Sequence, residues 1–158
     1  MTVPLPQTSD SGGDDDGGSS EFSKALKCVA DCLADQIISR ESDQVGVCLY
    51  GTEKHQNKNN FPHIYVLHDL DVPDAATIKK LRDMADGSDG TVGDLGSLRS
   101  RTFKFDYALW VCMTMFAEVK HKNVIKGIHI LTNCDDPSGP LQLPRALNRV
   151  LRDCLRVR

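Results

Sequence analysis

Four arginines near the end of the chain recur at a spacing that could bind phosphate groups. They are Arg145, Arg149, Arg152 and Arg156. Their separations of four, three and four residues place them in one stripe of a helix predicted for about Leu143 to Arg156. The opposite side of this helix is apolar and carries Leu147, Val150, Leu151 and Cys154. The stripe could contact the phosphates of a nucleic acid, and each contact would make binding more sensitive to salt. The competing interpretation, which we favour, is a solvated polar face.

Two adjacent carboxylates follow a predicted strand, at a position where open α/β sheets bind ligands. Asp135 and Asp136 belong to the loop Thr132–Asp136, and carboxylate oxygens are suitable ligands for Mg²⁺. Turn formation and helix capping are the more common roles of such residues. We therefore expect these carboxylates to shape the loop, and we expect no metal or cofactor.

The six cysteines suggest packing more than metal binding. Cys28 and Cys32 lie four residues apart on one flank of a predicted helix and could share a metal ion. Because no second CxxC motif or histidine pair stands at zinc spacing, we interpret them as packing residues. Cys48 and Cys112 lie within apolar runs, which is typical of buried thiols in a reduced compartment such as the nucleus or cytosol.

Histidines and glycines form no recognisable catalytic motif. The five histidines, none of them in an HExxH arrangement, are His55, His63, His68, His121 and His129. His129 alternates with apolar neighbours in a predicted strand, so we expect it in the core. The stretch Gly87–Gly96 lacks the GKS or GKT of a phosphate-binding loop, and residues 87–100 are predicted to form a flexible loop. The sequence therefore gives no sign of an enzyme.

Alternating helices and strands must position these groups. Phe22, Leu26, Val29, Leu33 and Ile37 mark one face of a helix that ends near residue 40. Further helices are predicted for about residues 74–86, with Asp74 as its cap, for 107–120, with Asp106 as its cap, and for 143–156. The helix over 107–120 is strongly apolar, and its residues predicted to point inward are Leu109, Trp110, Met113, Phe116 and Ala117. Strands are predicted for residues 45–50, 64–67 and 127–132. The first of these strands is apolar on both sides, as in a sheet covered by helices on both faces. The pattern predicts an α/β fold.

Charge and composition separate the beginning of the chain from the rest. Residues 1–21 contain five acidic and no basic residues, so the remainder carries +2 of the formal net charge of −3. These first residues are rich in Pro, Gly, Ser and Asp, and we predict that they form a disordered acidic leader. A charge of +2 is too small to predict nucleic-acid binding. No apolar run has the length of a membrane span, and the N-terminus lacks the pattern of a signal peptide.

Several sequence blocks, in order, resemble one known family. They are Leu49-Tyr-Gly-Thr-Glu-Lys54, Asn60-Phe61 with Ile64-Tyr-Val-Leu67 and Asp69-Leu-Asp71, Leu109-Trp-Val-Cys112, and Ile130-Leu-Thr-Asn133 with Asp135. Together they are similar to the N-terminal von Willebrand A-like domain of the seventy-kilodalton subunit of the DNA-end-binding protein Ku. The resemblance implies that residues 22–158 form part of a Rossmann-like, three-layer α/β sandwich.

The chain also departs from this family. The family's domain opens with a central strand that ends in an Asp-x-Ser-like turn, and here the acidic leader takes that place. We therefore expect an incomplete sandwich that lacks the first central strand and the last strands, from a fragment, a splice form or an imperfect gene model. The Mg²⁺ site of von Willebrand A domains also needs ligands from that first turn. The family's lyase activity uses a lysine near the first strand, and this role is not transferred to Lys24 or Lys27.

For function, the resemblance implies a nuclear, non-enzymatic interaction module. Relatives in this family pair with the other Ku subunit and form a ring on double-strand break ends. The ring binds DNA without reading its sequence, recruits end-joining proteins and serves telomere maintenance. Two alternatives remain: a metal-dependent von Willebrand A-type ligand-binding or enzymatic domain, and a truncated product without independent function.

Overall fold

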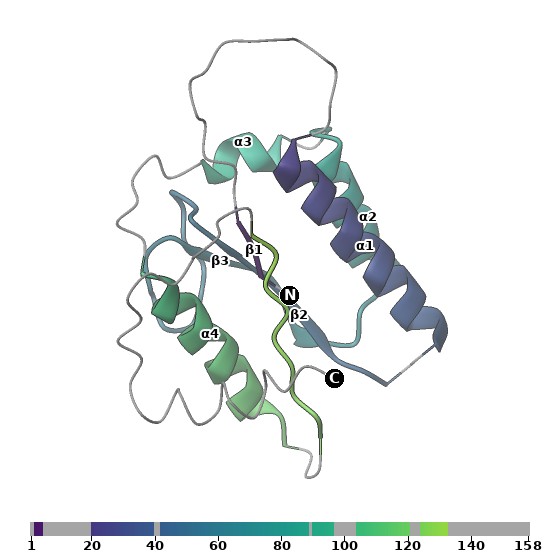
Figure 1. Ribbon diagram of the computed structural model, residues 1–158, viewed down its shortest axis with the longest axis vertical. Helices are drawn as coiled ribbons and strands as arrows, with labels where there is room; N and C mark the ends of the chain where they lie inside the picture. Colours follow the sequence, from purple (N-terminus) through teal and green to yellow (C-terminus); the bar gives the residue numbers. More distant parts are fainter. Residues whose placement is uncertain are drawn as a thin grey trace.

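A computed structural model describes residues 2–4, 20–39, 42–88, 90–96, 104–120 and 124–132. Its strands are β1 (Thr2–Pro4), β2 (Val45–Tyr50) and β3 (Ile64–Asp71). Its helices are α1 (Glu21–Ser39), α2 (Ala75–Ala85), α3 (Thr91–Leu95) and α4 (Phe105–Glu118). The sheet lies between α1 and α2 on one side and α4 on the other (Figure 1). Among the described residues, no helix is long and apolar enough to cross a membrane.

The sheet has the strand order β1-β2-β3. β1 is parallel to β2, with Val3 opposite Leu49, and β3 is antiparallel to β2, with Tyr65 opposite Leu49. The prediction of a disordered leader is therefore wrong for Thr2–Pro4, which pair with β2 where we expected no first strand. A strand of three residues gives no sequence signal, because it has too few side chains to show alternation. Residues 5–19 lie outside the described part of the chain.

β2 contributes side chains to two separate cores, as predicted for a strand covered on both faces. Val47 and Leu49 pack with the residues of α1 and α2, whereas Cys48 and Tyr50 pack with α4. All four side chains are buried. Alternation along one strand thus divides the molecule into two hydrophobic layers, because successive side chains point to opposite faces of a sheet. This is the three-layer α/β arrangement expected from the sequence.

The predicted apolar stripe of α1 faces the sheet and α2. Its side chains Phe22, Leu26, Val29 and Leu33 are buried. The predicted cap of α2 is also present, since the Asp74 carboxylate accepts a hydrogen bond from the Thr77 amide at 2.7 Å. Burying these apolar faces is the main stabilising contribution to both helices.

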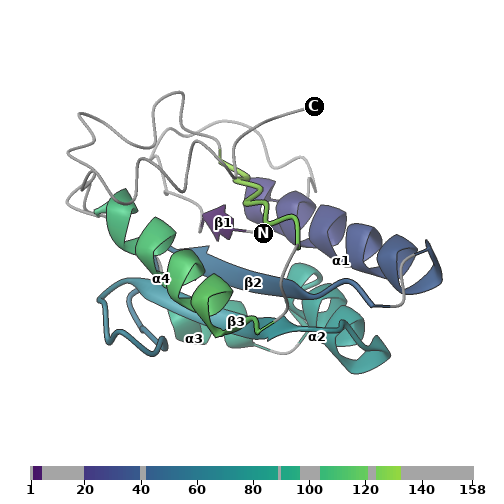
Figure 2. The same cartoon turned by 90° about the horizontal axis from the view of Figure 1, so that it is seen from below.

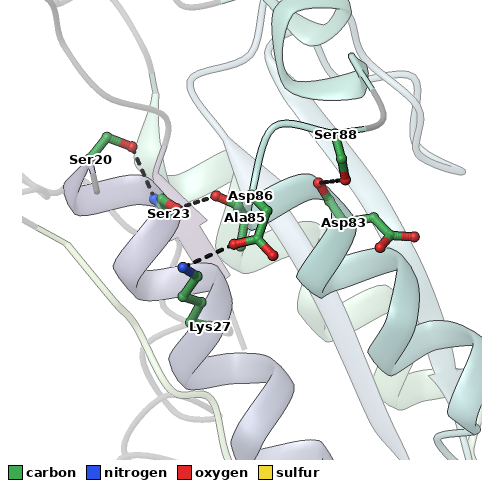
Figure 3. A network of polar contacts seen from close by, with 7 residues as sticks. All are labelled: Ser20, Ser23, Lys27, Asp83, Ala85, Asp86 and Ser88. Atoms are coloured by element: carbon green, nitrogen blue, oxygen red, sulfur yellow. Dashed lines mark hydrogen bonds and ion pairs between the residues drawn. The ribbon is translucent and has the colours of Figure 1, made fainter. Parts of the chain in front are cut away.

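Polar contacts fix the start of α1 against the end of α2 (Figure 3). The Ser20 hydroxyl accepts a hydrogen bond from the Ser23 amide at 3.1 Å and so caps α1. The buried Ser23 hydroxyl donates to the carbonyl of Ala85, the last residue of α2. Lys27 forms an ion pair with Asp86 at 2.9 Å. These contacts set the register between the two helices.

The second core lies under α4, which differs from its prediction in two respects. α4 begins at Phe105 with Lys104 at the cap position, so Asp106 lies in the first turn and does not cap the helix. Ala117, predicted to point inward, is exposed, and so is Trp110, also predicted to point inward, with 43% of its surface exposed. The position of Trp110 falls opposite the buried face that includes Leu109 and Cys112, when each residue is counted as roughly 100° of rotation.

Three further segments also differ from the sequence prediction. β3 extends to Asp71, four residues beyond the predicted strand end. Thr91–Leu95 form the short helix α3 within the predicted flexible loop. Residues 127–132 form no strand, although Ile130 makes an isolated bridge and the segment passes beside β1 (Figures 1 and 2). Ile130 and Leu131 pack against opposite cores, so this segment still alternates like a strand.

The outer side of β3 is partly occupied by the loop that precedes it. Gln56 forms a parallel bridge with Tyr65. The Gln56 amide donates to the Ile64 carbonyl at 3.0 Å, and the Val66 amide donates to the Gln56 carbonyl at 2.7 Å. The Asn57 side chain holds this loop, because its amide nitrogen donates to the carbonyls of Phe61 and Ile64.

Candidate functional site

The predicted chemical groups do not converge on one site in the described part of the chain. The arginine stripe (Arg145, Arg149, Arg152 and Arg156), the closing helix and the carboxylates Asp135 and Asp136 all lie outside the described residues. Within the described residues, no group of three or more His, Cys, Asp or Glu side chains could hold a metal ion. In the described residues, the features that could mark a site are therefore surface contacts, charges and exposed apolar groups.

The histidines are dispersed, and each described one has a different environment. His63 Nδ1 lies 2.9 Å from the Thr52 carbonyl, and His68 Nδ1 lies 3.4 Å from the Thr77 hydroxyl. His129, predicted to belong to the core, is exposed, because it points away from the side on which Ile128 and Ile130 pack.

The cysteines form two pairs with contrasting environments. Cys48 and Cys112 are buried, as predicted, and their thiols contact each other between β2 and α4. A hydrogen bond from Cys112 and burial raise the pKa of Cys48 well above its usual value, so this thiol stays protonated and unreactive. Cys28 and Cys32, predicted as packing residues, are exposed, and neither forms a disulfide. Partial burial, followed by the charge and hydrogen bond of Cys28, raises the pKa of Cys32.

A cleft lies beside the second half of α4, and we call it the α4 cleft. It has a volume of about 980 Å³. Gln36, residues 42–44, the start of β2, the end of β3 and residues 124–129 form its other walls. Its apolar lining includes Val45, Leu70, Val72, Met115, Phe116, Val119, Val124, Ile125 and Ile128. No catalytic constellation lies among these residues, so the cleft is suited to apolar contact.

Lys126 fixes the wall that residues 124–129 contribute to this cleft. Its ammonium group donates to the Phe116 carbonyl at 2.8 Å and lies 5.8 Å from the centre of the Phe116 ring. The first contact satisfies a carbonyl at the end of α4, where helix carbonyls lack partners within the helix. The neighbouring Ile125 is consequently held at the surface, where it is 98% exposed.

Exposed apolar side chains were the feature that the sequence prediction missed. Ile125, Val124 and Val72 border the α4 cleft, and Trp110 lies on the outer face of α4. Tryptophan is among the residues most enriched at the energetic centres of protein interfaces. The position of Trp110 could have been found by projecting Phe105–Glu118 on a helical wheel. Val124 and Ile125 form an apolar pair too short to show a periodic signal.

Lys58, a charged group beside the C-terminal end of α4, is paired with neighbouring carboxylates. Lys58 contacts Glu118 and lies 3.7 Å from Asp69. The hydrogen bond to Glu118 is the main reason that the pKa of Lys58 is raised. This lysine is therefore already paired with two carboxylates, which reduces its value as a phosphate contact.

Comparisons with known proteins agree with this α/β structure. The sequence profile of the Ku70/Ku80 N-terminal alpha/beta domain matches residues 9–150. The chain is 39% identical over 128 residues to the ATP-dependent DNA helicase ku70 of Dictyostelium discoideum, which covers 75% of this chain and 14% of that protein. It is 36% identical over 118 residues to the X-ray repair cross-complementing protein 6 of Mus musculus, covering 75% of this chain and 19% of that protein.

A third relative, the ATP-dependent DNA helicase 2 subunit 1 of Rhipicephalus appendiculatus, is 32% identical over 129 residues, covering 76% of this chain and 19% of that protein. The chain thus spans less than a fifth of the length of these three relatives. The family profile covers most of the chain, and the relatives from an amoeba, a mouse and a tick each align with three quarters of it. The chain belongs to the Ku70/Ku80 N-terminal alpha/beta domain family.

Proposed function

We propose that this chain is a protein-contact domain of a Ku70-like subunit, which acts in the nucleus with the other Ku subunit. In this proposal the assembled pair binds DNA double-strand break ends during non-homologous end joining and also serves telomere maintenance. The domain itself carries out no catalytic step. The observation that carries the proposal is the family match over residues 9–150. The names of the relatives, which include an X-ray repair protein, support a role in DNA repair.

The surface of the described residues favours protein contact over direct DNA contact. Trp110, Val72, Val124 and Ile125 are exposed apolar groups, and Lys27, Lys58 and Arg82 are each paired with carboxylates. DNA binding through phosphates needs a concentrated surface of unpaired basic groups. The proposed DNA contact therefore belongs to the assembled pair of subunits.

Assembly is tested by co-expressing the tagged 158-residue chain with the other Ku subunit. We expect the two to purify together and to elute from a sizing column as one complex. The complex should bind linear duplex DNA more tightly than closed circular DNA, because only the linear form has ends. Failure of the two chains to associate under conditions where each is folded would refute the proposal.

A matched pair of variants tests the role of the exposed face of α4. Trp110→Ser removes the exposed ring, whereas Thr114→Ala changes a side chain one turn further along the same face. If Trp110 lies at the centre of the contact, its replacement should weaken association more than about tenfold, as for other interface hot spots. Thr114→Ala should change the affinity little. Equal affinities for both variants and the unmodified chain would exclude this face from the contact.

A further inference from the structure

The α4 cleft reaches from one face of the sheet to the other. Its lining includes Gln36 of α1 and Met115 of α4, and these two helices cover opposite faces (Figure 1). Between them the cleft is bordered by Val45 and Gly46 of β2 and by residues 126–129. The cleft therefore separates two extended segments at the level of the sheet.

The position of β1 indicates how wide this separation is. β1 lies between β2 and the segment 124–132, as both views show (Figures 1 and 2). It pairs with Cys48–Tyr50, the second half of β2, whereas Val45 and Gly46 in the first half line the cleft. Because neighbouring strands lie about 4.7–4.9 Å apart, two segments that flank one strand are separated by roughly 9.5 Å. The cleft thus continues the row of β1 with the width of one strand.

The wall formed by residues 127–129 resembles a strand that lacks a neighbour. Ile128 is buried, and Ile130 and Leu131 pack against opposite cores. Within the described residues, however, the backbone amides and carbonyls of Gly127 and Ile128 form no hydrogen bonds. Unpaired backbone groups beside a hydrophobic core are costly. An extended peptide that enters the cleft supplies the missing partners, as in the addition of a strand to a sheet.

The side chains around the cleft define the chemistry of such a peptide. On the side of α4 the lining is mainly apolar and includes Leu70, Met115 and Phe116. On the side of α1 it is polar and includes Gln36 and Gln44. Because successive side chains of a strand point to opposite faces, a fitting segment alternates apolar and polar residues.

We propose that the α4 cleft binds an extended segment of another protein as an added strand, which pairs with Gly127 and Ile128. Its apolar side chains face α4, and its polar side chains face the end of α1. The three described strands of the chain are already paired with one another, so a second copy could supply one of them only by unfolding. The proposal does not depend on the role in DNA repair, because Trp110 lies outside the cleft lining.

The test titrates the 158-residue chain into a fluorescein-labelled peptide, Lys-Val-Gln-Val-Gln-Val-Lys, and follows the fluorescence anisotropy. We expect saturable binding. The same peptide with N-methylated valine and glutamine amides keeps its side chains but loses the backbone donors, so its affinity should be at least about tenfold lower. In the unmodified chain, the bound peptide should also slow hydrogen exchange of the Gly127 and Ile128 amides.

Two exposed isoleucines provide matched variants. Ile125 lines the cleft and is 98% exposed, whereas Ile38 is 84% exposed and is not part of the lining. Because the peptide would cover Ile125, Ile125→Ser should weaken binding about tenfold or more. Ile38→Ser should leave the affinity unchanged, and circular dichroism should show that both variants remain folded.

Three results would overturn the proposal. The first is the absence of saturable binding by the unmodified chain. The second is equal affinity for the peptide and its N-methylated form, or equal losses in Ile125→Ser and Ile38→Ser. The third is a dimer on a sizing column that excess peptide does not dissociate and that Ile125→Ser abolishes, because the occupant of the cleft would then be a second copy of the chain.

Discussion

The approach of α4 to the sheet depends on the missing side chain of Gly46 in β2. A Cβ atom at this position would lie 2.4 Å from the Met115 Cε atom and 3.4 Å from the Leu70 amide nitrogen. The first distance forces the methionine to move, whereas the second is an ordinary contact. The end of a methionine is flexible, and Met115 borders the α4 cleft into which it can turn. Gly46→Ala should therefore strain the contact with α4 without preventing folding.

The expected magnitude follows from two opposing effects. Overpacking of a core typically costs about 1–3 kcal/mol. Replacing glycine by alanine at a compatible backbone position stabilises by about 0.4–1 kcal/mol, because the unfolded chain loses freedom. Gly46→Ala should therefore lower the free energy of unfolding by about 1 kcal/mol. In a Met115→Ala background the overpacking disappears, and the same substitution should become stabilising by about 0.4–1 kcal/mol.

Urea denaturation of the four members of this double-mutant cycle measures the coupling, with the fluorescence of the single tryptophan as the signal. Gly93→Ala is the matched control, because no atom outside its own helix backbone and chain neighbours lies within 4 Å of the position its Cβ would take. If Gly46→Ala costs the same free energy with and without Met115, the two side chains are not coupled and the argument is wrong.

Two further predictions concern the helices on the other face. Leu33→Ala should lower the free energy of unfolding by about 2–5 kcal/mol, because Leu33 is fully buried. Ile38→Ala on the same helix should change it little, because Ile38 is 84% exposed. Urea denaturation compares the two variants, and equal losses of stability would contradict the assigned buried face of α1. Hydrogen bonds from the Thr77 hydroxyl and amide lower the pKa of Asp74 below its ordinary value. This carboxylate consequently stabilises the fold above its unfolded-state pKa, and the stabilisation is lost as the pH falls through the lower, folded-state pKa. Thermal melts of the unmodified chain and of Asp74→Ala should differ near neutral pH and converge in acid; a difference that persists in acid would show that the cap acts by other means.

Long periodic segments were predictable from the sequence, and short or non-local ones were not. The stripe from Phe22 to Leu33 identified the buried face of α1, and the apolar run Val45–Tyr50 identified a strand between two cores. Both signals are local, because they depend only on the repeat of one element. Thr2–Pro4 became a strand through pairing with β2, which no local pattern of three residues reveals.

The exposed side chains show a different limit. Trp110 and Cys32 lie on helices whose existence was predicted, yet Trp110 was predicted to point inward and Cys32 was interpreted as a packing residue, and both are exposed. Which face of a helix is buried depends on what packs against it. The helical wheel of α4 would have corrected Trp110, whereas the exposure of Cys28 and Cys32 follows from the place of α2 beside α1. Residues 143–156 remain untested as a helix.

The bridge at Gln56 has a consequence for how this sheet can grow. The backbone groups on the outer side of Ile64 and Val66 already have partners in Gln56, so another strand cannot pair with β3 at that end. The exposed carboxylates of Asp69 and Asp71 lie near the other end of β3. Charged side chains on an edge strand disfavour its pairing with a strand of another chain. Among the described residues, the β3 edge is thereby protected from edge-to-edge aggregation.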